Sequence, residues 1–86
     1  MNQIILSSAF ERQIKRLVKQ NPRFKNIISE VFKLLIGNIN HPSLKLHKLS
    51  GENNWSVSVT HKIRMIIHLE GKQIFCLRLG SHDKVY

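Results

Sequence analysis

The sequence has little cysteine, little acidic charge and no long apolar run, and each shortage excludes a class of protein. Its single cysteine, Cys76, cannot form a disulfide within the chain, which favours a reducing cytoplasm over a secreted, disulfide-stapled fold. No stretch approaches the about 18 apolar residues of a membrane span. Residues 1–8 are too short and too uncharged for a signal peptide. We therefore expect a cytoplasmic protein with no membrane partner, folded as one domain over residues 1–86.

The shortage of acidic residues is the strongest bulk property of the chain. Fourteen Lys and Arg face five Asp and Glu, which gives a formal charge of +9 and a pI near 10.4. A field this positive attracts polyanions, so nucleic acid is the first candidate partner and an acidic protein the second. An anionic membrane surface ranks third, because the basic residues are spread along the chain. A basic protein that is merely soluble stays open as a fourth interpretation.

Two amphipathic helices are predicted in the first half of the chain. The run NQIILSS predicts a first strand, after which Ser7 or Ser8 can cap a helix; Glu11, three residues after Ser8, completes a capping-box pattern. Apolar residues recur at helical spacing through residues 9–20 and again through residues 22–37. An Asn-Pro pair between them predicts a helical hairpin with a very short joint. The two apolar stripes consist of Phe10, Ile14, Leu17 and Val18, and of Phe24, Ile27, Ile28, Val31, Leu34 and Leu35.

Beyond a loop-rich stretch, the apolar period changes from helical to two. Residues 55–60, 62–70 and 73–80 alternate, and their short connections predict an antiparallel meander. The order is therefore β-α-α-β-β-β, an α+β fold in which the helical hairpin covers one face of a small, mostly antiparallel sheet. The covered face is predicted to carry Trp55, Val57, Val59, Ile63, Met65, Ile67, Leu69, Phe75, Leu77 and Leu79. The open face is predicted to carry Ser56, Ser58, Arg64, His68, Cys76 and Arg78, a polar, cationic surface for a ligand.

The five histidines are His41, His47, His61, His68 and His82. They show no metal-ligand spacing, and we expect neither a metal nor another cofactor. Histidine and arginine on a basic surface instead suit RNA cleavage, because RNA carries its own nucleophile in the 2′-hydroxyl. Imidazole can take or supply a proton near neutral pH, and arginine can hold phosphate oxygens. His41 and His68 are interpreted as structural, whereas His61 marks a turn and stays open.

Four candidate residues are expected to approach one end of the open sheet face. His82 lies just past the last strand, and Tyr86 follows four residues later. Arg64 lies on the preceding strand, and His47 lies in the basic segment that leads into the sheet. In an antiparallel meander these positions can converge.

The chain resembles the RelE/ParE superfamily of bacterial type II toxins over nearly all of its 86 residues. The resemblance is carried by the helical hairpin, HKLSG, KIRMIIHLE and the ending IFCLRLGSHDKVY, which is most similar to the YafQ-like branch of the mRNA interferases. It implies a RelE-like microbial RNase fold and a metal-independent endoribonuclease that cuts mRNA in the ribosomal decoding site. It also implies that the partners are a cognate antitoxin, the ribosome and mRNA, with DNA contacted only as the toxin–antitoxin complex.

The resemblance assigns roles by position. His82 matches the C-terminal catalytic histidine, Tyr86 the terminal aromatic residue, and His47 the histidine before the L-x-G turn. Arg64 matches the strand arginine that helps to stabilise the phosphorane. His82 and His47 are the expected general base and acid, in an order left open. The basic side chains expected to bind RNA or the ribosome are Lys45, Lys48, Lys62, Arg78 and Lys84.

The sequence also departs from the family pattern. The lysine pair of RelE falls on Ser56 and Ser58, so the lysine-based mechanism is not available. The strand histidine of the YafQ-like branch aligns near Val59; the closest histidine is His61, which we keep as a catalytic candidate. The acidic residue that the branch carries before the next strand falls near Ile63.

Two other functions fit the same sequence. A ParE-type toxin shares the fold but binds DNA gyrase and cuts no RNA, and it needs no proton-transfer groups. A non-catalytic RNA-binding module would use the positive charge alone, with an affinity that falls steeply with salt and does not depend on His82.

Overall fold

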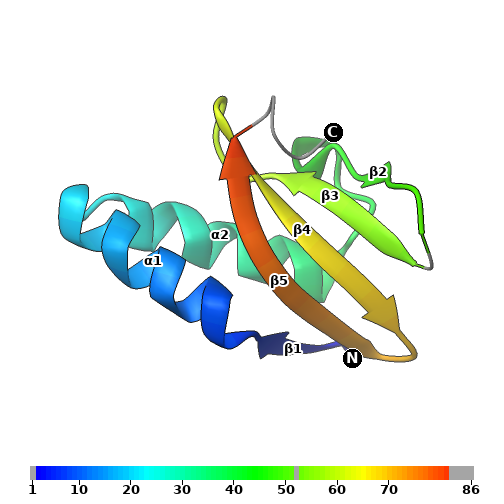
Figure 1. Ribbon diagram of the computed structural model, residues 1–86. Helices are drawn as coiled ribbons and strands as arrows, with labels where there is room; N and C mark the ends of the chain where they lie inside the picture. The colour runs from blue at the N-terminus through cyan, green and yellow to red at the C-terminus, as the bar shows by residue number, and fades with distance from the viewer. Residues whose placement is uncertain (1, 52, 82–86) are drawn as a thin grey trace.

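The computed structural model describes residues 2–51 and 53–81, and these form two helices packed on one five-stranded sheet. The sheet order is β1-β5-β4-β3-β2, with β1 parallel to β5 and the other pairs antiparallel. Both helices lie on the same face of the sheet (Figure 1). The predicted α+β class, helical hairpin and C-terminal meander are confirmed. The elements are β1 (Gln3–Leu6), α1 (Ser8–Gln20), α2 (Phe24–Gly37), a 3-10 turn η1 (Pro42–Leu44), β2 (His47–Lys48), β3 (Asn54–Ser58), β4 (Ile63–Glu70) and β5 (Gln73–Ser81).

The start of α1 distinguishes between the two predicted caps. Ser7 is the N-cap: its hydroxyl accepts a hydrogen bond from the Phe10 amide at 3.0 Å and donates one to the Leu77 carbonyl of β5 at 2.7 Å. Ser8 is instead the first helical residue, so the predicted pairing of Ser8 with Glu11 as a capping box is wrong. A side chain that caps the helix and bonds a strand fixes the direction in which α1 leaves β1.

The joint between the helices is as short as predicted. Asn21 ends α1 through its amide, which donates to the Leu17 carbonyl, and its side-chain Oδ1 accepts from the Arg23 amide at 3.2 Å. The second helix then begins at Phe24 and ends at Gly37. Pro22 in the joint has no amide hydrogen to leave unpaired, which suits the first turn of a helix.

The hydrophobic core fills the space between the helices and the sheet. Phe10 of α1, Leu35 of α2 and Met65 of β4 are fully buried there. The ring of Phe10 also lies 6.2 Å from that of Phe32, in a tilted arrangement. Half-buried Ile14, Leu17 and Val18 complete the stripe predicted for α1. Each helix is stabilised by burying its apolar stripe against the sheet.

A β-bulge changes the two faces of β5. Ile66 of β4 pairs with Arg78, but the next residue, Ile67, pairs with Cys76, so Leu77 is an extra residue on β5. Before this extra residue, each β5 side chain lies on the sheet face opposite to the one that simple alternation predicts. Cys76 is therefore fully buried in the core with Ile74, and the prediction that Cys76 lies on the open face is wrong. Phe75 and Leu77, predicted to lie on the covered face, are displaced from it for the same reason.

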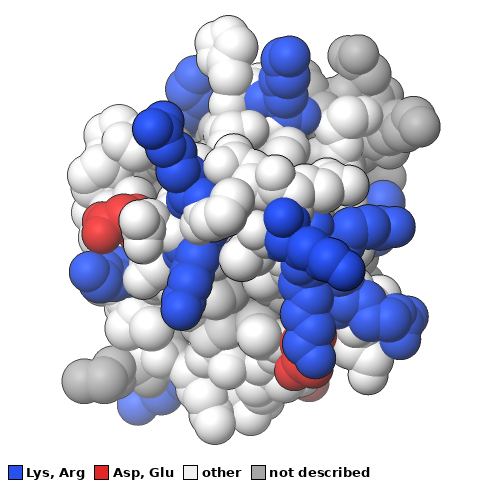
Figure 2. All heavy atoms as spheres, turned by 90° about the vertical axis from the view of Figure 1, so that its left-hand side faces the viewer, with Lys and Arg blue, Asp and Glu red and all other residues white. Residues whose placement is uncertain are grey.

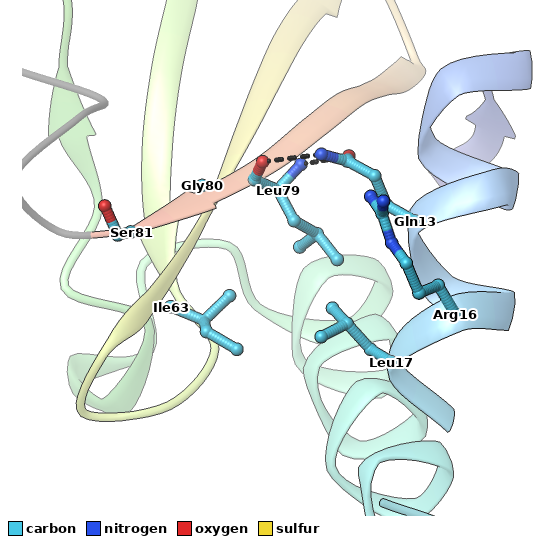
Figure 3. A pocket seen from close by; sticks show the side chains of 7 residues that line it. All are labelled: Gln13, Arg16, Leu17, Ile63, Leu79, Gly80 and Ser81. Atoms are coloured by element: carbon cyan, nitrogen blue, oxygen red, sulfur yellow. Dashed lines mark hydrogen bonds between the residues drawn. The ribbon is translucent and has the colours of Figure 1, made fainter. Parts of the chain in front are cut away.

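Helix α1 also closes the edge of β5 beyond the end of β1. The side-chain amide of Gln13 donates to the Leu79 carbonyl at 2.9 Å and accepts from the Leu79 amide at 2.7 Å, as a neighbouring strand would (Figure 3). A hollow of about 200 Å³ lies beside this pair, with Leu17 and Ile63 on its lining. Gln13 therefore satisfies backbone groups that the short β1 does not reach.

Candidate functional site

The open sheet face is organised in cross-strand rows that run perpendicular to the strands. One row consists of Arg78 on β5, Ile66 on β4, Ser56 on β3 and His47 on β2. The neighbouring rows contain Gly80, Arg64 and Ser58 on one side, and Phe75, His68 and Asn54 on the other. Because the helices cover the opposite face, the exposed side chains of these rows are the ones available for a ligand.

A groove of about 490 Å³ lies over the first of these rows. His47 and Lys48 of β2 line one side and Arg78 of β5 the other, while Ile66 and Leu77 contribute apolar surface between them. Among the described residues that line the groove, none is acidic. Its lining is completed by Leu49, Ser50 and Asn54. Cationic sides and an apolar base suit a ligand with an anionic backbone and a flat apolar part.

Lys48 is positioned by an aromatic ring. Its ammonium nitrogen lies 5.3 Å from the centroid of the Trp55 ring, and the two residues pair across β2 and β3. A cation over an indole face is attracted by the ring quadrupole. This contact favours a defined position for one of the predicted RNA-binding cations at the edge of the groove.

A second hollow, of about 450 Å³, adjoins the end of β3. Lys45, His61 and Arg64 are among the residues that line it. His61 lies in the turn between β3 and β4, where the Thr60 hydroxyl accepts hydrogen bonds from the amides of Lys62 and Ile63 at 3.2 and 3.1 Å. The turn that presents His61 is therefore built by a side chain and not by backbone pairing alone.

Arg64 differs most from its predicted setting. It was expected on a solvated open face, but it is 3% exposed, and its neighbour Ser56 is fully buried. The Nε and Nη2 atoms of Arg64 donate to the Ser56 hydroxyl at 3.1 and 2.9 Å, and Nη2 also donates to the Lys45 carbonyl at 2.9 Å. A buried cation requires such hydrogen bonds, because desolvation alone would make it unfavourable.

The remaining histidines make local contacts, as predicted for them. His41 Nδ1 accepts from the Ser43 amide at 3.1 Å and so caps η1. His68 Nδ1 lies 2.9 Å from Asn54 Oδ1, and its Nε2 lies 3.6 Å from a carboxylate oxygen of Glu70. These contacts fit structural roles in the loop and on the strand.

The predicted site residues thus divide into three groups. The structure brings His47, Lys48 and Arg78 together in the first groove, and Lys45, His61 and Arg64 in the second hollow. Lys62 is exposed in the turn beside His61 and lines neither. The predicted residues His82, Lys84 and Tyr86 lie outside the described residues.

Five groove residues were not predicted from the sequence: Leu49, Ser50, Asn54, Ile66 and Leu77. Leu49, Ser50 and Asn54 belong to the loop-rich stretch before the predicted meander, and this is the one signal that pointed to them. Ile66 and Leu77 carry no signal for a groove, because apolar strand residues are ordinarily read as core. Their placement depends on the strand register and on the bulge.

Metal and thiol chemistry are not suggested by the part of the chain that the structure describes. Within residues 2–51 and 53–81, no three His, Cys, Asp or Glu side chains are grouped to hold a metal ion. Burial raises the pKa of the Cys76 thiol from 9.0 to about 12, so this thiol is protonated and unsuited to act as a nucleophile. No described helix is long and apolar enough to cross a membrane.

The helical layer is also basic. Figure 2 shows Lys and Arg side chains over the face that the helices form, with few acidic ones among them. Its cations include exposed side chains of α1 and the joint: Arg12, Lys15, Arg16, Lys19, Arg23 and Lys25. The positive field therefore surrounds the molecule, and the open face is distinguished by its histidines and grooves and not by charge alone.

A helical hairpin on a five-stranded mixed sheet is the fold of small bacterial toxins. The E. coli DinJ–YafQ toxin–antitoxin complex contains a chain 21% identical, with a TM-score of 0.76, over 99% of this chain and 97% of that one. A metal-bound toxin from Helicobacter pylori is 23% identical, with a TM-score of 0.82, over 100% of both chains. A YoeB/ParE toxin from Agrobacterium tumefaciens is 14% identical, with a TM-score of 0.80, over 95% of this chain and 99% of that one. The resemblance to RelE/ParE toxins such as YafQ is confirmed at the level of the fold.

The comparisons by sequence are negative. No protein-family model matches the chain, and no curated protein matches it. The likeness is therefore one of structure.

Proposed function

We propose that this chain is the toxin of a type II toxin–antitoxin system and a metal-independent endoribonuclease that cuts mRNA on the ribosome. The observation that carries the proposal is the groove on the open sheet face, where His47, Lys48 and Arg78 surround an apolar base. A proton-transfer group in the same groove as a cation that can reach phosphate oxygens is what cleavage by the RNA 2′-hydroxyl requires. The fold shared with YafQ and YoeB/ParE toxins supports the same conclusion.

In the proposed reaction, a general base takes the proton of the 2′-hydroxyl, and the 2′-oxygen attacks the adjacent phosphorus. The bond from phosphorus to the 5′-oxygen breaks, and a general acid gives that oxygen a proton. The products are a 2′,3′-cyclic phosphate and a 5′-hydroxyl. His47 and His82 are the proposed base and acid, in either order, and His61 is a further candidate for proton transfer.

The arginines and the terminal tyrosine have positioning and charge roles in this proposal. Arg78 lines the groove and is exposed, so it can reach a phosphate oxygen, whereas Arg64 is buried. Tyr86 is proposed to stack on a base and orient the backbone for in-line attack. Lys45, Lys48, Lys62 and Lys84 are proposed to bind the phosphates of mRNA or of the ribosome.

The proposed regulator is a cognate antitoxin that covers the basic surface. The solved DinJ–YafQ toxin–antitoxin complex supports a partner of this kind. The toxin would act in the cytoplasm, where the ribosome and mRNA are found, and would contact DNA only within the toxin–antitoxin complex.

The experiment is primer extension on a defined mRNA with programmed ribosomes, comparing the wild type with His47→Ala and His82→Ala. The proposal expects a discrete cut near the decoding site that requires ribosomes and that both substitutions reduce at least about 100-fold, which is the low end of acid–base catalysis. His41→Ala is the matched control, because His41 bonds only within its loop in the described contacts, and it should cut normally. Absence of any cut by the wild type would contradict the proposal, and a DNA supercoiling assay would then test a gyrase-binding toxin.

A further inference from the structure

Strand β2, which carries His47, is a two-residue strand at one edge of the described sheet. Among the described residues it pairs with one strand, β3, through the pairs His47–Ser56 and Lys48–Trp55. The chain approaches it through Lys45, whose φ of 47° and ψ of 53° are left-handed. That conformation costs about 1 kcal/mol or more for a residue with a side chain. A support from outside β2, at the Lys45 segment, would therefore help to fix the position of His47.

The buried arginine supplies this support. Arg64 of β4 pairs with Ser58 of β3. Its guanidinium, however, donates to the hydroxyl of Ser56, which lies two residues before Ser58 on β3. From there Nη2 reaches the Lys45 carbonyl at 2.9 Å. One side chain of β4 thus joins β3 to the segment that enters β2.

Ser56 is at the centre of the arrangement. It is fully buried, its hydroxyl accepts from two nitrogens of Arg64, and it is the direct cross-strand partner of His47. A fully buried hydroxyl cannot itself contact RNA. Any effect of Ser56 on cleavage must therefore be transmitted through its neighbours.

We propose that Ser56 and Arg64 form a brace that positions His47 in the groove, and that Arg64 acts through this brace and not as a ligand of the reacting phosphate. The catalytic part of the inference rests on the proposed ribonuclease function. The structural part, that His47 takes its position from Ser56 and Arg64, holds for the free protein and can be measured without RNA.

The chain offers a matched pair of serines for the test. Ser56 and Ser58 lie on the same strand and the same face, but the Ser58 hydroxyl donates to the Thr60 carbonyl, at 3.4 Å, and not to Arg64. We expect Ser56→Ala to lower kcat about tenfold, with KM for programmed ribosomes changed less than about twofold, because positioning acts on the transition state. Ser58→Ala should leave both constants near the wild type, and Ser56→Thr, which keeps the hydroxyl, should recover most of kcat.

A second experiment separates the positive charge of Arg64 from its hydrogen bonds. Arg64→Lys keeps the positive charge but cannot bond Ser56 through two nitrogens and reach Lys45 as well. If the brace positions His47, Arg64→Lys should lower kcat to a similar extent as Ser56→Ala. A largely active Arg64→Lys together with a normal Ser56→Ala would overturn the proposal, since charge at the phosphate would then suffice.

The deciding readout is NMR of the free, folded protein. We expect Ser56→Ala and Arg64→Lys to move the His47 ring signals and to speed exchange of the His47 amide, which lies in a hydrogen-bonded pair with Ser56. Ser58→Ala should do neither. Unchanged His47 signals in both brace variants would overturn the inference even if the wild type cuts mRNA. Changed signals in a protein that cuts no RNA would instead retain the brace and refute the proposed function.

Discussion

The two faces of one sheet are built by different rules. The face under the helices is packed with apolar side chains such as Phe10, Leu35 and Met65, all fully buried. The open face also buries residues, but Ser56 and Arg64 among them are polar, and hydrogen bonds hold them. Packing therefore determines stability on one face, and a few directed contacts determine geometry on the other. Substitutions should separate the two properties.

The largest loss of stability is expected on the covered face. Phe10→Ala removes a fully buried ring and its contact with Phe32, and it should cost about 3–5 kcal/mol of the free energy of unfolding. Urea denaturation measures this directly. Ile36→Ala is the control, because Ile36 is 41% exposed, and its cost should stay within about 0.5 kcal/mol. Equal costs at both positions would contradict the packing described for this face.

A smaller loss is expected where α1 meets β5. Gln13→Ala leaves the amide and carbonyl of Leu79 without their side-chain partner, at a cost of about 1–3 kcal/mol. Gln20→Ala, at the exposed end of the same helix, should change stability little. Faster exchange of the Leu79 amide in Gln13→Ala alone would locate the effect at the sheet edge; unchanged exchange would argue against it.

The buried thiol makes stability fall at high pH. Below pH 9, Cys76 is protonated in both states and adds no pH dependence. Between 9.0 and about 12 the unfolded thiol loses its proton while the folded one keeps it. Stability should then fall by up to about 1.4 kcal/mol per pH unit from this group. Other groups also titrate there, so the wild type is compared with Cys76→Ala; a stability difference independent of pH between 8 and 10.5 would contradict the burial of Cys76.

The smallest of these losses concerns the cap of α1. Ser7→Ala removes the bond to the Phe10 amide and the bond to the Leu77 carbonyl, and about 1–2 kcal/mol should be lost. Ser8→Ala should be neutral within about 0.5 kcal/mol, since Ser8 is already inside the helix. A larger loss at Ser8 than at Ser7 would mean that the cap is misplaced.

The contrast between the packed face and the open face also explains which features could be predicted from the sequence. Apolar spacing predicted both helices and the three C-terminal strands, because each is longer than one period of its own pattern. It placed Cys76 on the wrong face because one extra residue, Leu77, reverses the alternation of β5. It missed β2 because two residues show no period. Covered-face positions such as Val57, Met65 and Ile67 were predicted correctly.

The candidate site was less predictable than the core. The groove joins His47 to Arg78 across strands far apart in the sequence, and the register that aligns them follows from the whole sheet. The burial of Arg64 depends on the carbonyl of Lys45, 19 positions earlier, and no local pattern encodes this contact. The predictions for His82, Lys84 and Tyr86 stay predictions, because these residues lie outside the described ranges.

The most direct test of the open face as the functional face compares two arginines, one on each layer. Arg78→Gln and Arg12→Gln each remove one exposed positive charge, the first from the groove and the second from α1. Cleavage of mRNA on programmed ribosomes should fall about tenfold or more in Arg78→Gln, because a cation that faces the phosphate stabilises the transition state. Arg12→Gln should cut at a rate close to the wild type. Equal losses in the two variants, or a larger loss in Arg12→Gln, would contradict the assignment of function to the open face.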